Sequence, residues 1–265
     1  MKKICPFLLL LLAVACKNKD KNENGNNIPP SDQPKNISYS IVNSYPHDTS
    51  SFTEGLLIYQ GSLYESTGNY KNSKLLKIDI NTGKPLMEAK LEDKYFGEGI
   101  AIIKDTIYQL TYHEHTVFVY TLKDFRKVRE MHFDLDEGWG MTTDGTYLIA
   151  SDGSCNIYYF EPSTFKLIKK IAVTDAGALV YNINELEYVD GYIYSNQWQL
   201  PYLLKIDPND GKVIAKADLN DMWNRVKAKD PQADVPNGIA YDSATKKMYV
   251  TGKLWPSLFE IQFGQ

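Results

Sequence analysis

The sequence predicts an all-β fold, a five-bladed β-propeller whose last blade is closed by a strand from the N-terminus. Three observations support this prediction. Short apolar and β-branched segments recur along the chain with two-residue polar turns between them, as in hairpins. A turn rich in Gly and Glu precedes such a segment five times, at intervals of 44, 41, 45 and 53 residues. A repeat of this length that contains only strands is typical of propellers, and here the last repeat lacks one strand.

Each repeat begins with its distinctive turn, which leads into a first strand. The five turns, with the first large apolar residue after each, are residues 52–56, 96–100, 137–141, 182–186 and 236–239. The first strands of propeller blades surround one axis. We therefore expect the acids, amides and aromatics of these turns to lie close together and to form a site.

The rest of each repeat provides a second hairpin. Residues 75–79 and 203–207 are near copies, and each leads into a turn that contains Gly83 or Gly211. Four strands per repeat make one blade. Residues 218–229, before Pro231, are the one stretch that we expect to form a short helix.

The last repeat has strands at 247–251 and 258–263, after which the chain stops. Residues 38–45 precede the first blade and have no partner there. Because an unpaired long edge promotes aggregation, we predict that 38–45 pairs with 258–263 and closes the ring. Residues 37–265 then form one domain, which we expect to be a monomer.

The first 16 residues are predicted to be a signal peptide rather than part of the fold. Lys2 and Lys3 are followed by an apolar run at 7–12, a small-residue cleavage site at 13–15 and then Cys16. This arrangement resembles a bacterial lipoprotein signal, in which Cys16 is lipidated; the alternative is an ordinary secretory signal with an incidental Cys. The apolar run is too short to span a bilayer. We expect a protein of the cell envelope, anchored by lipid on the periplasmic or surface side of a bacterial membrane.

Residues 17–36 are polar and contain almost no apolar side chains, which predicts a disordered tether. The formal charge of the chain is −4 and no basic cluster is present, so nucleic acid is not an expected partner. If Cys16 is acylated, Cys155 has no partner and the mature chain contains no disulfide.

Several residues of the turns could carry chemistry. Glu98 lies between two glycines next to Phe96, where burial would raise its pKa toward neutrality and suit it to general acid and base catalysis. The alternative is a carboxylate that only accepts hydrogen bonds from backbone amides. Trp139 and Trp198 are interpreted either as an aromatic wall for a ligand or as packing between blades.

Asn184 and Asn237 occupy equivalent points of two repeats, where they either hold a substrate amide or satisfy turn backbone. Lys253 either stabilises negative charge or is solvated. His113 and His115 are two residues apart on a predicted strand end, but no third ligand is visible, so a zinc site is not predicted.

The chain resembles the plant-type glutaminyl-peptide cyclotransferases over about residues 41–263, in order through every blade. The matching motifs are FTEGL at 52–56, YESTG at 64–68, YFGEG at 95–99, GWG at 138–140, TDG at 143–145, SDG at 151–153, NELEY at 184–188, NGIA at 237–240 and VTGKLWP at 250–256. The family fold is a five-bladed propeller, which agrees with the repeat count.

The resemblance implies that an N-terminal glutamine of a peptide or protein cyclises to pyroglutamate and releases ammonia. It implies that Glu98 is the general acid and base and that Asn184 and Lys253 orient the substrate or stabilise the oxyanion. Substrate contacts are expected from Phe52, Glu54, Phe96, Tyr112, Trp139, Glu185, Trp198, Asn237 and Trp255. No cofactor is required by this reaction, although a structural cation in the central channel is left open.

The chain departs from the family pattern at two pocket positions. The family commonly has Gln where this chain has Glu54, and Trp near Tyr112, so substrate preference or pH range is expected to differ. The same residues leave two other functions open: a propeller that binds peptides or another ligand without catalysis, and a metal-dependent lactonase with Glu54, Glu98 and Glu185 around an axial cation.

Overall fold

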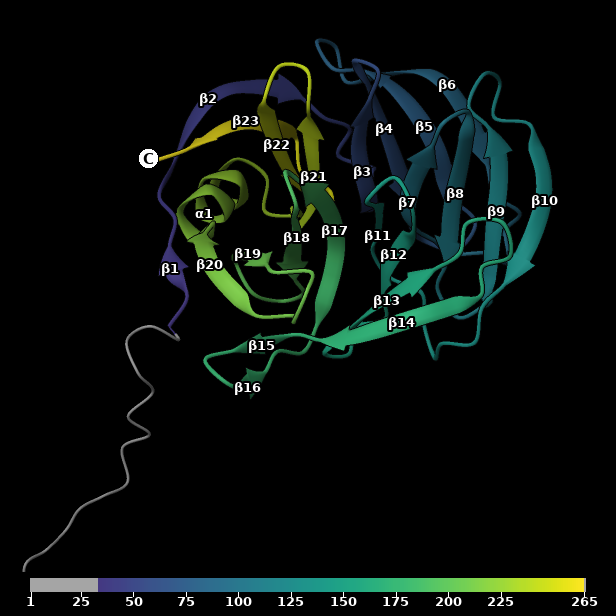
Figure 1. The fold of residues 1–265 in the computed structure, drawn as a ribbon. Coiled ribbons are helices and arrows are strands. Elements are labelled where there is room, and N and C mark those ends of the chain that lie inside the picture. Colours follow the sequence, from purple (N-terminus) through teal and green to yellow (C-terminus); the bar gives the residue numbers. More distant parts are fainter. Residues whose placement is uncertain (1–32, 265) are drawn as a thin grey trace, which may run out of the picture.

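The computed structural model describes residues 33–264 and shows five blades, each of four antiparallel strands, arranged in a ring (Figure 1). The innermost strands of the five sheets, β3, β7, β11, β17 and β21, lie around the centre of the ring. The prediction of an all-β, five-bladed propeller is therefore confirmed. The predicted signal peptide, Cys16 and most of the predicted tether lie outside the described residues.

Each blade runs from an inner to an outer strand. The first blade comprises β3 (Thr53–Tyr59), β4 (Ser62–Thr67), β5 (Lys74–Asp79) and β6 (Lys84–Lys90). The second comprises β7 (Gly97–Ile103), β8 (Thr106–Thr111), β9 (Thr116–Thr121) and β10 (Lys127–His132). The third comprises β11 (Met141–Thr143), β12 (Leu148–Ser151), β13 (Asn156–Phe160) and β14 (Leu167–Ala172). A small hairpin, β15 (Thr174–Asp175) and β16 (Ala178–Leu179), leads to the fourth blade. The fourth blade comprises β17 (Ile183–Val189), β18 (Tyr192–Gln197), β19 (Tyr202–Ile206) and β20 (Val213–Asp218). The fifth blade comprises β21 (Pro236–Asp242), β22 (Lys247–Gly252), β23 (Ser257–Phe263) and β2 (Tyr39–Pro46).

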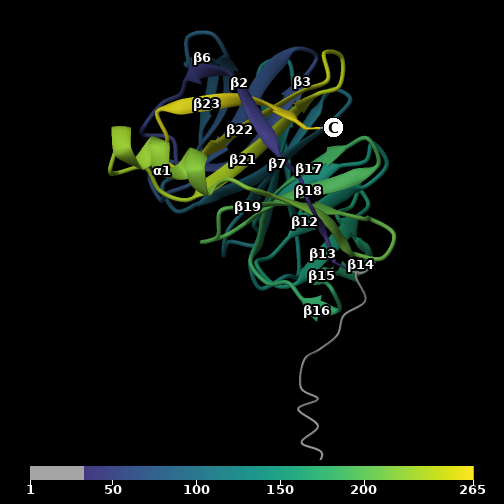
Figure 2. The same cartoon turned by 90° about the vertical axis from the view of Figure 1, so that its left-hand side faces the viewer.

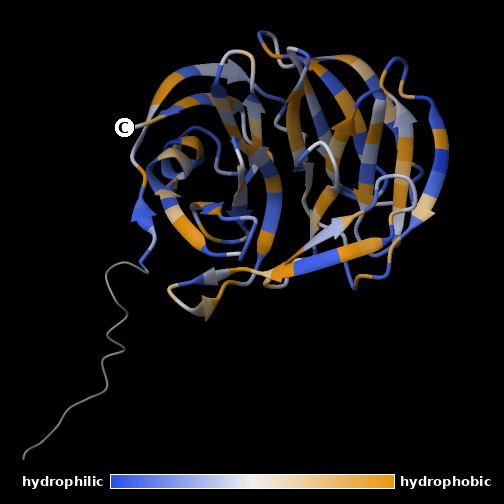
Figure 3. Ribbon diagram, in the orientation of Figure 1, coloured by the Kyte–Doolittle hydropathy of each residue, from blue (hydrophilic) through white to orange (hydrophobic). Residues whose placement is uncertain are grey.

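The hydrophobic core lies between the faces of adjacent blades. The large apolar residue that follows each distinctive turn is almost fully buried, and these residues are Leu56, Ile100, Met141, Leu186 and Ile239. Polar and apolar residues alternate along many strands, as the bands in Figure 3 show. This period of two matches the pleat of a strand and places the apolar side chains against the next blade.

Glycines allow the inner strands to touch at their starts. A Cβ on Gly55 would lie 2.7 Å from the Ile100 nitrogen, and one on Gly99 would lie 2.2 Å from the Met141 nitrogen. A Cβ on Gly140 would lie 2.2 Å from the Asn184 carbonyl oxygen. Since backbone atoms cannot move aside cheaply, only glycine permits this approach. The recurring glycines of the repeat thus close the ring around its axis.

The N-terminal strand closes the last blade as predicted. β2 pairs antiparallel with β23, with a register from Tyr39 opposite Phe263 to Pro46 opposite Ser257 (Figure 2). Regular structure extends into the predicted tether, because β1 (Lys35–Asn36) pairs parallel with β20. The prediction that the tether extends to residue 36 is therefore wrong for Lys35 and Asn36. The backbone groups of these two residues form hydrogen bonds with the edge strand of the fourth blade.

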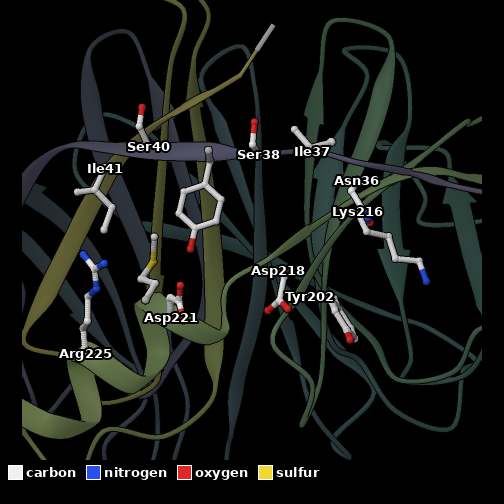
Figure 4. A pocket seen from close by; sticks show the side chains of 12 residues that line it. Asn36, Ile37, Ser38, Ser40, Ile41, Tyr202, Lys216, Asp218, Asp221 and Arg225 are labelled. Atoms are coloured by element: carbon white, nitrogen blue, oxygen red, sulfur yellow. The ribbon is translucent and has the colours of Figure 1, made fainter.

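The predicted helix is α1 (Asn220–Lys229), which connects the fourth blade to the fifth and buries Met222 and Val226. A groove of about 880 Å³ separates α1 from the N-terminal strands (Figure 4). None of the residues predicted for the site lines this groove. Within residues 33–264, no helix has the length and apolar character needed to cross a membrane.

Candidate active site

The five distinctive turns place five side chains at equivalent points of the ring. Each stands directly before the residue that contacts the neighbouring blade, and they are Glu54, Glu98, Trp139, Asn184 and Asn237. The repeat therefore brings residues from distant parts of the chain to one end of the axis. The first four of these side chains line one pocket of about 210 Å³.

The pocket has an aromatic wall and a polar floor. Its lining consists of Phe52, Glu54, Phe96, Glu98, Tyr112, Trp139, Asn184, Trp198, Asp234 and Lys253. Pockets for drug-sized ligands measure roughly 300–1,000 Å³, so this one is suited to a single amino-acid side chain with its amine.

Glu98 is the second residue of β7, and its side chain is buried. Gly97 and Gly99 flank it because neither position has room for a Cβ, as the Thr67 carbonyl and the Met141 nitrogen lie too close. Burial raises the pKa of Glu98 well above its ordinary value, and the charge of Glu54 raises it further. No hydrogen-bond donor within the described part of the chain reaches this carboxyl. Glu98 is therefore a carboxyl group with an increased affinity for a proton, and it is available to a ligand.

Glu54 forms a buried ion pair with Lys253. The Lys253 Nζ lies 2.6 Å from Glu54 Oε1, and the Asn237 amide donates to Glu54 Oε2 over 3.1 Å. Burial raises the pKa of Glu54 to about 6, although the Lys253 charge opposes this shift. Lys253 also lies 4.4 Å from the centre of the Phe52 ring, a cation–π distance. The floor of the pocket thus contains two carboxyl groups and one ammonium group.

Asn184 presents an unpaired acceptor. Its side chain is buried, and its Oδ1 atom has no hydrogen-bond partner. The Asn184 backbone is fixed, since its carbonyl accepts a bond of 2.8 Å from the Ser151 hydroxyl. A buried acceptor without a donor is costly, by about 1–3 kcal/mol, unless a ligand provides the missing N–H.

The aromatic wall is formed by rings that contact one another edge to face. Trp139 and Trp198 lie 5.5 Å apart at 84°. The Trp139 indole donates to the Glu137 carboxylate over 2.7 Å, and its ring fills the space beside Gly153, where a Cβ would lie 2.5 Å from it. Phe96 contacts both Phe52 and Tyr112. Such packing fixes the orientation of the rings before a ligand arrives.

Three predicted contact residues do not line the pocket. Glu185, Asn237 and Trp255 are fully buried behind it. Asn237 donates to Glu54 and to the Thr53 carbonyl, while the Trp255 indole donates to the Asp234 carbonyl. Asn237 and Trp255 therefore hold residues that line the pocket.

Glu185 occupies the position at which the other four turns have glycine. Its carboxylate fills the space that a glycine leaves and accepts hydrogen bonds from the backbone of Leu56 at 3.1 Å and of Ile239 at 2.9 Å. One side chain of the fourth blade thus joins the first and the fifth blades beside the axis. Burial raises the pKa of Glu185 well above its ordinary value, with a further contribution from Glu187.

A buried network behind the pocket was not predicted. His47 follows β2, and its Nδ1 lies 2.7 Å from the Trp255 carbonyl oxygen while its Nε2 lies 3.2 Å from Glu65 Oε1. The same Glu65 oxygen accepts a hydrogen bond of 2.7 Å from the Thr53 hydroxyl. The network joins the closing strand to the turns that carry Glu54 and Lys253. Both residues lie outside the repeated turns, and although Glu65 belongs to the YESTG motif, nothing in the sequence indicated a role for it.

Asp234 is a further pocket residue that the sequence reasoning missed, although its place two residues before Pro236 in the fifth turn was a usable signal. His113 and His115 lie in the turn after β8 and not on a strand. No group of three or more His, Cys, Asp or Glu among residues 33–264 is arranged to hold a metal ion.

Comparisons with known proteins agree on one family. The family model described as glutamine cyclotransferase matches residues 8–263. A glutaminyl-peptide cyclotransferase of Arabidopsis thaliana is 38% identical over 228 residues, which are 85% of this chain and 71% of the relative. The crystal structure of Myxococcus xanthus glutaminyl cyclase superposes with a TM-score of 0.81 at 34% identity, covering 87% of this chain and 98% of the other.

Proposed function

Because the chain belongs to the glutamine cyclotransferase family, we propose that it cyclises N-terminal glutamine in the pocket of Glu98, with that residue as the proton carrier. The protein is a glutaminyl-peptide cyclotransferase. The α-amine of the substrate attacks its own side-chain amide carbon. A C–N bond closes the five-membered ring, the bond to the amide nitrogen breaks, and pyroglutamate and ammonia result.

The substrate contains its own nucleophile, so the protein must fold it back and exclude water. Because the amine and the amide belong to one residue, the reaction is already intramolecular, and the pocket contributes by restricting the side chain to the folded-back conformer in which the reacting atoms are in contact. The small volume of the pocket and the fixed rings of Trp139 and Trp198 serve this purpose. The rest of the substrate peptide, beyond its first residue, extends out of the open end of the pocket.

Glu98 carries the proton between the two nitrogen atoms. Its carboxylate first accepts the surplus proton of the amine nitrogen that has bonded to the amide carbon, and the raised pKa of Glu98 strengthens it as a base. The carboxylic acid so formed then donates that proton to the departing amide nitrogen, which leaves as neutral ammonia. Glu98 returns to its starting state, and no proton is gained or lost overall.

Asn184 and Lys253 position the substrate and the charge that develops on it. The unpaired Asn184 Oδ1 accepts an N–H of the substrate amine or amide. The Lys253 ammonium, already aligned by Glu54, provides positive charge for the oxygen of the tetrahedral intermediate. These roles use groups whose orientation is fixed before the substrate binds.

One observation carries the proposal: the Glu98 carboxyl and the Asn184 side chain face the same aromatic pocket, and the buried Asn184 Oδ1 has no hydrogen-bond partner there. The direct test is to incubate the purified protein with a Gln-initiated peptide and to measure the loss of one ammonia by mass spectrometry. The same peptide with an acetylated N-terminus has no nucleophile and must stay unchanged. Reaction of the acetylated peptide, or of neither peptide, would contradict the proposal.

Since the substrate contributes the nucleophile and Glu98 transfers the proton, we propose that no cofactor takes part. A chelator should then leave the rate of ammonia release unchanged.

We also propose that Cys16 is lipidated after removal of residues 1–15 and that the enzyme acts as a monomer on the outer face of a bacterial membrane. The sequence Ala13-Val14-Ala15-Cys16 after an apolar run supports the anchor. Mass spectrometry of the N-terminal peptide from membrane-extracted protein tests the acylation, and light scattering of the detergent-free domain tests the monomer.

A further inference from the structure

Exposed apolar side chains gather in one segment, residues 166–181, which we call the rim segment. Leu167, Ile168, Leu179 and Tyr181 are each about half exposed, at 46%, 50%, 50% and 55%. The part of the chain that the structure describes has nine exposed large hydrophobic residues, and these four fall within sixteen residues. Single apolar residues on a surface are ordinary, whereas four in one short stretch of the chain call for an explanation.

The rim segment is also basic. It contains three lysines, Lys166, Lys169 and Lys170, all exposed, and one acid, Asp175, whose charge is paired with Lys216. The Lys169 ammonium lies over the Tyr159 ring at 4.2 Å and stays at the surface. The whole chain has a formal charge of −4, so this local excess of positive charge is opposite in sign to the rest.

The described chain begins against this segment. Gln33 and Lys35 line the same pocket as Ala176 and Gly177, the turn between β15 and β16. Figure 1 and Figure 2 both show β14, β15 and β16 along one edge of the ring, the edge at which the described chain starts. The proposed lipid at Cys16 precedes this point by 17 residues, and a flexible chain of that length has a mean reach of roughly 20–25 Å.

We propose that the rim segment docks on an anionic lipid surface. An anchor at Cys16 keeps the ring near the membrane, so that even a weak patch is engaged through a high effective concentration. Leucine, isoleucine and tyrosine side chains enter the headgroup layer, and the lysines are attracted within a Debye length of about 8–10 Å. Within the rim segment, β14 is the outer strand of the third blade, and β15 and β16 form a separate hairpin. No residue of the rim segment lines the pocket.

The experiment places an environment-sensitive fluorophore on the full-length, membrane-extracted protein. Ala178→Cys puts the label on β16 without removing an apolar residue of the rim segment. Ala244→Cys is the matched control, because Ala244 is equally an exposed alanine and lies in the turn between β21 and β22, on the opposite edge in Figure 1. Cys155 is buried and Cys16 is acylated under the proposal, so each variant takes one label.

The labelled proteins are reconstituted into vesicles of phosphatidylethanolamine with phosphatidylglycerol, and in parallel into phosphatidylcholine vesicles. We expect a blue shift for the Ala178→Cys label only, on the anionic vesicles only, and its loss in high salt or in a Lys169→Glu, Lys170→Glu background. Equal shifts at both labels, or none at position 178 on anionic vesicles, would overturn the proposal. A shift at position 178 that depends on protein concentration and not on lipid would show that a second copy of the chain covers the segment.

The proposal rests on the anchor and not on the chemistry of Glu98. Flotation of the protein with the vesicles tests the anchor separately, and ammonia release from a Gln-initiated peptide tests the catalytic assignment. A protein that floats and cyclises its substrate, but gives no shift at position 178, contradicts the docking surface alone.

Discussion

Two carboxyl groups and one ammonium group share the floor of the pocket, and their charges set the affinity of Glu98 for its proton. Glu54 raises the pKa of Glu98, and Lys253 lowers it. Lys253 is bonded to Glu54 and not to Glu98, so the ion pair only partly cancels the effect of the second carboxylate. The residue at position 54 is therefore expected to set the pH range of the enzyme.

Replacing Glu54 by Gln should move the acidic limb of the rate profile to lower pH. The change removes a negative charge beside Glu98 and leaves the Lys253 charge uncompensated, and both effects lower the pKa of Glu98. Gln keeps the shape of the side chain and still accepts from Lys253, so activity should remain. Profiles of kcat/KM against pH for the two proteins provide the measurement. Coincident acidic limbs would show that Glu54 does not influence Glu98.

At the scale of single elements, each turn combines a structural glycine with a functional neighbour. Gly55, Gly99 and Gly140 let the inner strands touch, and this contact places the preceding side chain at the mouth of the ring. Glu185 takes the place of the fourth glycine and links two other turns through their backbone amides. The precision of the site therefore comes from strands and not from long loops, as preorganised catalysis requires.

The closing strand gives a second test. A variant that begins at Gln33 retains β1 and β2 and should match the longer protein in solubility and melting temperature. A variant that begins at Pro46 loses the strand that pairs with β23, which leaves a long unpaired edge. It should melt at a lower temperature and aggregate. Thermal unfolding with light scattering makes the comparison; equal behaviour would remove β2 from the closure of the ring.

The features of the fold and of the site that depend on the repeat could be predicted from the sequence. The blade count, the closing strand and the equivalence of Glu54 with Glu98 all follow from aligned turns. The Lys253–Glu54 pair could not be predicted, because 199 residues separate its members and the contact exists only once the ring is closed. The strand at Lys35–Asn36 could not be predicted either, since two polar residues carry no periodicity. The resemblance implies a substrate contact for Trp255, yet its ring is fully buried and does not line the pocket.

At the scale of the whole molecule, ring closure and the site are joined through His47. Its two nitrogens face two acceptors, the Trp255 carbonyl and the Glu65 carboxylate. Two N–H groups satisfy both, which favours the imidazolium. Burial lowers the pKa of His47, but the charge of Glu65 and these hydrogen bonds outweigh it, and the pKa is raised above its ordinary value of 6.5.

A raised pKa makes the stabilisation depend on pH in a definite direction. The contribution of protonated His47 is complete below pH 6.5 and is lost as the pH rises through the higher pKa of the folded state. His47→Gln should therefore cost most stability in mildly acidic solution, about 3–5 kcal/mol for a broken buried pair, and less at alkaline pH. Unfolding by denaturant at several pH values measures the difference, with the exposed His132→Gln as control. A cost that is constant with pH, or equal in both variants, would argue against a charged His47.

The central claim, that Glu98 carries the proton of the reaction, is tested most directly by the rate of ammonia release from a Gln-initiated peptide by Glu98→Gln. The carboxamide keeps the size of the side chain and cannot exchange a proton with the substrate. We predict that kcat/KM falls by about 10²–10⁴-fold, while the circular dichroism spectrum and the melting temperature stay those of the unmodified enzyme. A rate close to that of the unmodified enzyme, in a variant that is fully folded, would contradict this assignment.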